Sequence, residues 1–243
     1  MRFYVQNLDE RALDAAESRH ATQVLRLKEG SLITAFNGRG KEAKVRITSA
    51  CKERVEFEVL SQQQNPLPAC HLQLCQALPK GKAMDWILQK VTELGVQSIF
   101  PIQSDRSVVA IDEDKSEHKL ERWTQTVSEA CKQCGQNWLP QVHAPSSLQA
   151  FLDSLNPGGL RLIASLQPEA KPLPQVLKDA WAQGPVPHII YMVGPEGDFT
   201  PSEIGKARAA GFLPVSLGPN ILRTETATLY LTSALLYEVQ NQA

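Results

Sequence analysis

Two glycine- and proline-containing turns near the C-terminus are the part of this chain best suited to bind a small molecule. Residues 194–200 read GPEGDFT and residues 217–227 read LGPNILRTETA. Each turn follows an apolar run typical of a strand and leads into a segment typical of a helix. Because ligands of open α/β sheets bind at the carboxyl edge of the strands, we expect both turns to line one cleft. Backbone N–H and C=O groups would supply most of its contacts.

The second turn also carries the residues that could react with a ligand. Arg223, Thr224, Glu225 and Thr226 follow it directly and would lie at the mouth of the cleft. An arginine and a glutamate at such a place are suited to stabilise charge and to move a proton. The alternative is that Arg223 and Glu225 form a surface ion pair of little energetic value.

The elements that would position these turns alternate between strand and helix after residue 69, which predicts a largely parallel sheet covered on both faces. Thr200, Pro201 and Glu203 form the pattern of a capping box, which predicts a helix start directly after the first turn. The expected strands are 72–78, 98–102, 161–165, 188–193 and 214–217, and the expected helices are 82–94, 114–134, 173–182, 201–210 and 225–239.

The N-terminal part has a different pattern. Residues 31–61 contain three runs of alternating apolar and polar residues, with a turn at 37–40, and residues 13–27 are helix-like. This pattern predicts a small β-barrel or sandwich. The polar, proline-bearing segment 62–68 reads as a linker, so we expect one domain at 1–68 and another at 69–243.

Charge and cysteine content narrow the class of protein. The net charge is −1, but residues 19–54 hold nine basic and three acidic residues, a local charge of +6. Such a patch fits a phosphate-rich partner, and a solvated face of mixed charge is an equally good interpretation. An odd cysteine number, the absence of a signal-peptide pattern and the lack of a long apolar run favour a cytoplasmic protein that does not enter a membrane.

Motifs for other chemistries are weak. Cys131 and Cys134 have CxxC spacing, but no second pair completes a zinc site, so we expect no metal. No glycine-rich dinucleotide motif follows the first strand of the α/β part. Helix 225–239 is apolar nearly all round, which indicates burial, either in a subunit interface, the interpretation we favour, or inside the domain.

Taken together, these motifs resemble the RsmE family of the SPOUT superfamily of knotted methyltransferases, which forms 3-methyluridine in small-subunit ribosomal RNA. The resemblance covers essentially the whole chain, and its two C-terminal motifs are highly specific. The matching residues are Arg2-Phe3, His20, Val24-Leu25-Arg26, Gly30, Phe36-Asn37-Gly38, Lys82, Gln89-Lys90, Glu93-Leu94-Gly95, Arg106-Ser107, Gln133-Cys134-Gly135, Gly194-Pro195-Glu196-Gly197 and Leu222-Arg223-Thr224-Glu225-Thr226-Ala227.

The resemblance implies a PUA-like β-barrel followed by a trefoil-knotted α/β domain, with S-adenosylmethionine as cofactor. It also implies 16S rRNA of the small ribosomal subunit as partner and a homodimer formed through the C-terminal helix. Arg223 and Glu225 would be catalytic. The residues implied to bind cofactor are Leu166, Gly194, Pro195, Glu196, Gly197, Leu217, Gly218, Leu222, Thr224 and Thr226, and those implied to bind RNA are Arg2, His20, Arg26, Arg39, Lys82 and Arg106.

Three residues depart from the family pattern. Asp198 stands where a second glycine is common, and Gln136 and Asn220 stand where basic residues are common. The loss of two positive charges leaves the detailed RNA contacts open and should flatten the salt dependence of RNA binding. Two other functions stay open: a SPOUT enzyme with a tRNA or ribose target, and a non-catalytic rRNA-binding assembly factor.

Overall fold

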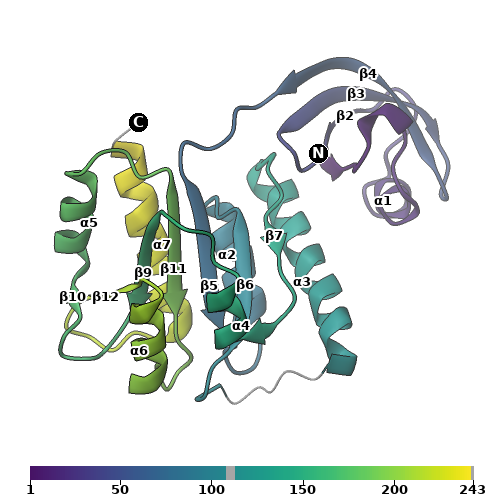
Figure 1. Ribbon diagram of the computed structural model, residues 1–243. Coiled ribbons are helices and arrows are strands. Elements are labelled where there is room, and N and C mark those ends of the chain that lie inside the picture. Colours follow the sequence, from purple (N-terminus) through teal and green to yellow (C-terminus); the bar gives the residue numbers. More distant parts are fainter. Residues whose placement is uncertain (108–112, 242–243) are drawn as a thin grey trace. The chain divides into compact units, whose positions relative to one another are not determined.

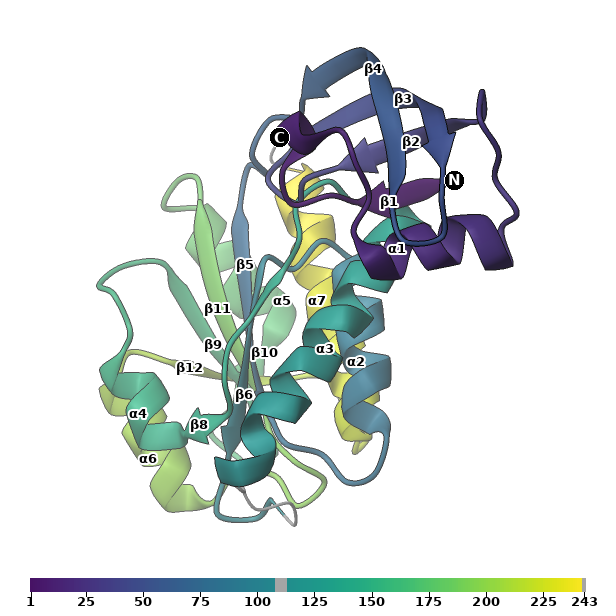
Figure 2. The same ribbon diagram turned by 90° about the vertical axis from the view of Figure 1, so that its right-hand side faces the viewer.

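The computed structural model describes residues 1–107 and 113–241, without the side chains of residues 113–115. The chain divides into two compact units, and each is described by itself. The first contains Met1–Leu67 and Ser128–Leu139, and the second contains Pro68–Val127 and Pro140–Ala243. The elements can be followed in Figures 1 and 2. Residues 128–139 thus join the first unit, whereas the domain limits 1–68 and 69–243 stay a prediction.

The first unit is built on a four-stranded sheet. Its order is β1 (Arg2–Tyr4), β2 (Leu32–Phe36), β3 (Lys41–Ala50) and β4 (Val55–Gln64). The last three strands pair antiparallel as the sequence predicts, and the short β1 adds in parallel to β2. Inward side chains alternate with outward ones along β3, so the sheet has one apolar face.

Strand β4 is longer than predicted. Gln62, Gln63 and Gln64, which the sequence pattern placed in a linker, pair with Ala43, Glu42 and Lys41 of β3. The pairing depends on backbone groups, and these exposed glutamines do not need to alternate with apolar residues to take part in it. The β-structure therefore continues to the point where Asn65 and Pro66 end it.

Helical turns cover the first unit. They are the 3₁₀ turn η1 (Leu8–Glu10), α1 (Ala15–Arg19) and the π-helical turn η2 (His20–Val24), and the last two confirm the predicted helix at 13–27. The end of α3 (Glu113–Cys134) belongs here too. Lys132 Nζ lies 2.7 Å from Glu17 Oε1 and 2.5 Å from Glu129 Oε1, and burial raises the pKa of the Glu17 carboxyl.

The second unit contains a parallel sheet, which confirms the predicted α/β architecture. Its long strands are β5 (His71–Ala77), β6 (Ser98–Gln103), β9 (Leu160–Ala164), β11 (His188–Val193) and β12 (Leu213–Ser216). The short strands are β7 (Gln141–Val142), β8 (Ser146–Ser147) and β10 (Lys171–Pro172). The order is β10-β12-β9-β11-β5-β6-β7, with β8 beside β6.

The connecting helices are where the sequence predicts them, with one addition. α2 (Ala83–Glu93), α5 (Leu173–Trp181) and α6 (Pro201–Ala209) match the expected segments. At the start of α6 the Thr200 side chain accepts the Glu203 N–H and the Glu203 side chain accepts the Thr200 N–H, so the capping box is confirmed. The additional helix α4 (Leu148–Asp153) has six residues, too few for a helical pattern to be recognised.

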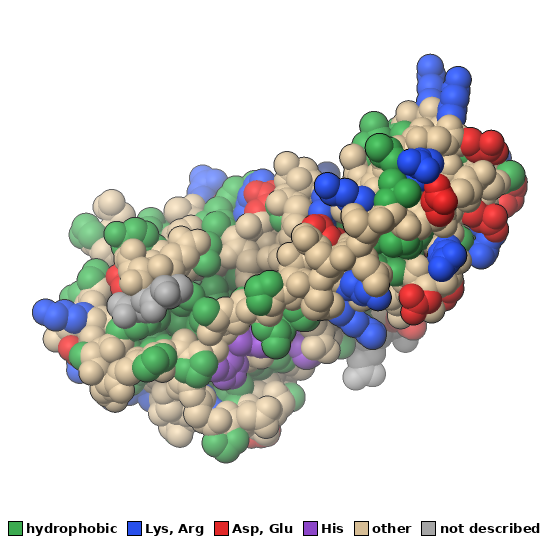
Figure 3. All heavy atoms as spheres, turned by 90° about the horizontal axis from the view of Figure 1, so that it is seen from above, with side chains coloured by type: hydrophobic (Ala, Val, Ile, Leu, Met, Phe, Trp, Pro, Cys, Tyr) green, Lys and Arg blue, Asp and Glu red, His purple; other side chains and the backbone are tan. Residues whose placement is uncertain are grey.

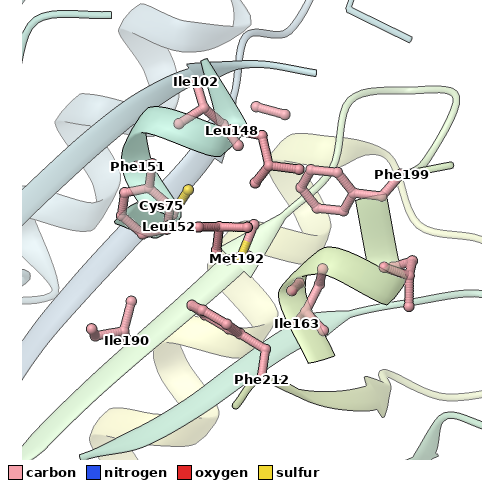
Figure 4. Close-up of a cluster of buried hydrophobic side chains, with 13 residues drawn as sticks. Cys75, Ile102, Leu148, Phe151, Leu152, Ile163, Ile190, Met192, Phe199 and Phe212 are labelled. Carbon is pink, nitrogen blue, oxygen red and sulfur yellow. The ribbon is translucent and has the colours of Figure 1, made fainter. Parts of the chain in front are cut away.

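One face of the sheet carries a core that α4 and α6 complete, and Figure 4 shows its side chains converging. Phe151 and Leu152 of α4 and Ile204 and Ala207 of α6 contribute from the helices. Leu148 of α4, the loop residues Phe199 and Phe212 and several strand residues supply the rest of the apolar surface. The buried strand members are Cys75, Ala77, Ile102, Ile163, Ile190 and Met192.

Helix α7 (Thr224–Asn241) lies beside α2 and β11. Its buried face includes Thr224, Thr228 and Thr232, which are spaced by four residues, together with Leu231 and Leu235. The prediction that this helix is apolar nearly all round missed that threonines form part of its buried stripe. A threonine hydroxyl can donate its hydrogen bond to the backbone carbonyl one turn earlier, so a threonine is tolerated on a buried helix face.

Candidate active site

Three loops at the carboxyl edge of the second unit's sheet form one pocket, and two of them are the turns that the sequence predicts to share a cleft. They follow β9, β11 and β12. After β12 the chain continues to the start of α7, where Thr224 reaches Gln76 of β5. The lining residues are Ala164, Ser165, Leu166, Val193, Gly194, Pro195, Glu196, Asp198, Leu217, Gly218, Asn220, Ile221, Leu222, Thr224 and Ala227.

The loop after β11 is tied to each neighbouring loop by a different residue. Glu196 Oε1 accepts the Lys80 backbone N–H at 3.0 Å, which fixes it to the loop after β5. The Gly197 carbonyl accepts from Arg106 Nη1 at 2.7 Å, after β6. Asp198 Oδ2 accepts the Leu166 N–H at 3.2 Å, after β9. These three bonds together hold the loop in one conformation.

A buried polar network supports the same loop from beneath. The Thr224 hydroxyl donates to the Gly194 carbonyl at 2.7 Å and accepts from Gln76 Nε2 at 3.1 Å. Gln76 Oε1 accepts from the Thr228 hydroxyl at 2.6 Å. The Tyr191 and Thr232 hydroxyls are 2.7 Å apart, and burial raises the pKa of Tyr191 well above its ordinary value. The start of α7 is thus held against the floor of the pocket.

Arg223 and Glu225 lie at the edge of this pocket, on either side of Thr224. Arg223 is exposed and Glu225 is half-buried. Within the described part of the chain neither side chain has a hydrogen bond or an ion pair, so the alternative of an Arg223–Glu225 surface pair is not what the structure contains. The guanidinium is free to contact a substrate.

Most residues predicted to bind a cofactor line the pocket, and two do not. Gly197 is covered by the Arg106 side chain, and Thr226 is an exposed residue of α7. The lining residues that pattern reasoning missed are Ala164, Ser165, Val193, Asp198, Asn220, Ile221 and Ala227. Of these, Asp198 carried a signal, because an acidic residue replaced an expected glycine.

Comparison with known proteins identifies the chain. Residues 65–236 match the model of an RNA methyltransferase domain, and residues 13–60 match that of an RNA methyltransferase PUA domain. Ribosomal RNA small subunit methyltransferase E of Bacillus subtilis is 33% identical over 94% of this chain and 90% of its own length. The chain belongs to this methyltransferase family. The fold class implied by the resemblance, a SPOUT α/β domain with a small N-terminal PUA-like domain, is confirmed.

Solved structures of similar proteins agree. Ribosomal RNA small subunit methyltransferase E from Neisseria gonorrhoeae, bound to S-adenosylmethionine, has a TM-score of 0.86 at 34% identity and covers 97% of this chain and 96% of its own. A Legionella pneumophila protein with the same cofactor bound has a TM-score of 0.82 at 33% identity and covers 93% and 90%.

The pocket of this methyltransferase fits the chemistry of such a cofactor. Backbone groups and apolar side chains suit an adenine ring, and the carboxylates of Glu196 and Asp198 suit cationic groups. The hollow measures about 70 Å³, which is small for a whole cofactor. Leu166 is 59% exposed and Ile221 is 81% exposed, so both rim side chains have room to turn outward and widen it.

The residues predicted to contact RNA differ in whether their side chains are exposed or already bonded to other residues of the same unit. His20, Arg26 and Arg39 of the first unit are exposed, as is Lys82 of the second. In the first unit, the Arg2 guanidinium bonds to Glu42 and Asn137 and lies over the Phe36 ring. In the second, Arg106 is engaged with Gly197. Basic and acidic side chains are interspersed on the face that Figure 3 shows.

The remaining sequence candidates have structural explanations. Burial raises the pKa of the Cys131 thiol to about 12, as expected of a packed residue rather than a metal ligand. In residues 1–107 and 113–241 no group of three or more His, Cys, Asp or Glu is placed to hold a metal ion. Over the same residues, no helix has both the length and the apolar character needed to cross a bilayer.

Proposed function

We propose that this methyltransferase transfers a methyl group from S-adenosylmethionine to N3 of a uridine in 16S rRNA. The observation that carries the proposal is the three-loop pocket with the unpartnered Arg223 at its edge. Membership of a family whose relatives are named ribosomal RNA small subunit methyltransferase E, one of them solved with this cofactor, supports it.

The chain's own residues would act on the uracil. The bound cofactor supplies an electrophilic methyl group on a sulfonium. Neutral uracil carries a proton on N3, so nitrogen becomes nucleophilic only as that proton leaves and negative charge develops on the carbonyl oxygens. Arg223 would stabilise that charge, and Glu225 would accept the proton. Holding both reactants in line supplies much of the remaining acceleration.

The role of Arg223 can be tested separately from binding. Arg223→Ala should leave the dissociation constant of S-adenosylmethionine unchanged and lower the methylation rate about 10²–10³-fold, as the loss of a charge-stabilising donor does. Arg208→Ala, on the exposed surface of α6, is the matched control and should keep the wild-type rate. Wild-type methylation by Arg223→Ala would show that the assigned role is wrong.

The substrate is identified by labelling. The protein is incubated with methyl-labelled S-adenosylmethionine and ribosomal subunits from cells that lack it, and the nucleosides are analysed by mass spectrometry. We expect 3-methyluridine in 16S rRNA, with assembled subunits as a better substrate than naked RNA. Label in tRNA or on a ribose would indicate another SPOUT activity. RNA binding without binding of the cofactor would indicate an assembly factor.

RNA binding is proposed for the exposed basic residues of both units. His20, Arg26, Arg39 and Lys82 have side chains available to phosphates. Arg2 and Arg106 belong to the same proposed set, but their guanidinium groups would have to contact RNA while keeping their present partners. The slope of the logarithm of the binding constant against the logarithm of the salt concentration measures how many phosphate contacts each substitution removes.

A homodimer through α7 and a cytoplasmic location complete the proposal. Tyr230 and Tyr237 are 48% and 64% exposed on the outward side of the helix, which supports an interface there. Light scattering after size exclusion should give twice the chain mass for the wild type and the chain mass for Tyr230→Glu with Tyr237→Glu.

A further inference from the structure

Asp198 has an unusual backbone conformation for a residue with a side chain. Its φ is 59°, in the left-handed region, where only Arg11 and Arg26 join it among the described residues other than glycine. This conformation is costly for most side chains, and aspartate and asparagine tolerate it best because they bond locally to the backbone. An aspartate here therefore needs contacts that hold it in place.

Both carboxylate oxygens of Asp198 have such contacts. Oδ1 accepts the Phe199 N–H at 2.8 Å, and Oδ2 accepts the Leu166 N–H at 3.2 Å. A Cβ atom placed on Gly194 would lie 3.2 Å from Oδ1, so the carboxylate lies against the start of the same loop. The carboxylate is thus fixed in the pocket wall, where it joins the loop after β9 to the loop after β11.

The charge that Asp198 brings has no basic counterpart among the lining residues. Glu196 and Asp198 are the ionisable side chains that line the pocket within the described chain, and both are acidic. Glu196 is exposed, so water and salt screen its charge, whereas Asp198 is half-buried. Arg106 contacts the same loop, but its side chain is exposed and does not line the pocket.

We propose that Asp198 determines the selectivity of the pocket for the sulfonium form of the cofactor over the thioether product. This inference rests on the proposed function, because it assumes S-adenosylmethionine as the methyl donor. The sulfonium carries one positive charge that S-adenosylhomocysteine lacks. A fixed, half-buried carboxylate attracts the donor more than the product, which favours exchange of product for donor after each transfer.

The test compares binding of the two ligands by isothermal titration calorimetry. Asp198→Asn removes the charge, keeps one of the two oxygen acceptors and tolerates the left-handed backbone. The lost acceptor affects both ligands alike, whereas the lost charge should lower the preference for S-adenosylmethionine over S-adenosylhomocysteine about fivefold, as the loss of a single-charge attraction predicts. Asp179→Asn removes the same charge from the exposed surface of α5, outside the pocket lining, and should change both constants less than twofold.

The outcomes separate the inference from the proposed function. If Asp198→Asn weakens both ligands equally, or weakens neither, Asp198 does not determine charge selectivity, although the methyltransferase assignment stands. If the wild-type protein binds neither ligand, the proposed function fails and the inference fails with it. Asp198→Gly removes the whole side chain at no conformational cost, and it should reduce the ratio of the two constants as Asp198→Asn does.

Discussion

Replacement of Gln76 by methionine tests whether the buried network beneath the pocket stabilises the second unit. Gln76 is fully buried in β5. Its Nε2 lies 2.9 Å from the Ala77 carbonyl, 3.4 Å from the Val193 carbonyl and 3.1 Å from the Thr224 hydroxyl. Methionine has a similar length and no hydrogen-bond donor of this kind, so the substitution removes the amide while it largely keeps the volume.

The expected loss of unfolding free energy follows from counting which hydrogen bonds remain in the variant. The Thr228 hydroxyl retains its bond to the Thr224 carbonyl, and the Thr224 hydroxyl retains its bond to the Gly194 carbonyl. The substitution removes the two N–H donors that the three acceptors share and the oxygen that accepts from Thr228, so three hydrogen bonds are lost. At about 0.5–1.5 kcal/mol for each bond, Gln76→Met should lower the free energy of unfolding by about 2–4 kcal/mol. In a unit of this size, that lowers Tm by roughly 5–15 °C.

Urea denaturation followed by circular dichroism measures the change. Gln89→Met is the matched control, because Gln89 is an exposed residue of α2 with no hydrogen-bond partner in the described structure. The unfolding free energy of this variant should stay within about 0.5 kcal/mol of that of the wild type. If Gln76→Met is equally neutral, the network does not stabilise the unit and the reasoning is refuted.

Two further predictions concern the backbone of the pocket and the pH dependence of stability. Gly218 lines the pocket with φ 116°, so Gly218→Ala should lower the free energy of unfolding by about 1–3 kcal/mol. Gly205 lies in helix α6, where alanine is favoured over glycine, so Gly205→Ala should raise it by about 0.5–1 kcal/mol. Equal effects of the two substitutions in urea denaturation would contradict this reasoning. Burial, and then the charges of His71 and Arg161, lower the pKa of His188 below 6.5. The contribution of neutral His188 to the free energy of unfolding is therefore present above pH 6.5 and lost as pH falls. His188→Gln should make the urea midpoint fall less steeply between pH 7 and 5. If the midpoint of the variant depends on pH as steeply as that of the wild type, His188 is not the cause.

Local signals made much of the second unit predictable. Thr200, Pro201 and Glu203 determine the start of α6 through contacts within four residues, so the capping box could be read directly. The apolar run of β11 lies between Pro187 and Gly194, and its limits were predicted to the residue. The pocket followed from the rule that parallel strands bring their carboxyl ends to one edge.

Contacts between residues far apart in the chain could not be read in the same way. The bond between Gln76 and Thr228 joins residues 152 positions apart, and nothing in either local sequence indicates the other. The pairing of Lys132 with Glu17 spans 115 positions and is one of the contacts that join residues 128–139 to the first unit. The bond between Asp198 and Leu166 depends on the left-handed backbone of Asp198, which no pattern of hydropathy encodes.

The composition of the first unit has a consequence for how the protein is made. Its strands are complete at Gln64, but Ser128–Leu139 must also be synthesised before the amine of Lys132 can reach Glu17. At about 5–20 residues per second, the 68 residues from Asn65 to Lys132 take roughly 3–14 s to translate. During that interval the Glu17 carboxylate of the nascent chain lacks the Lys132 amine that pairs with it in the folded unit.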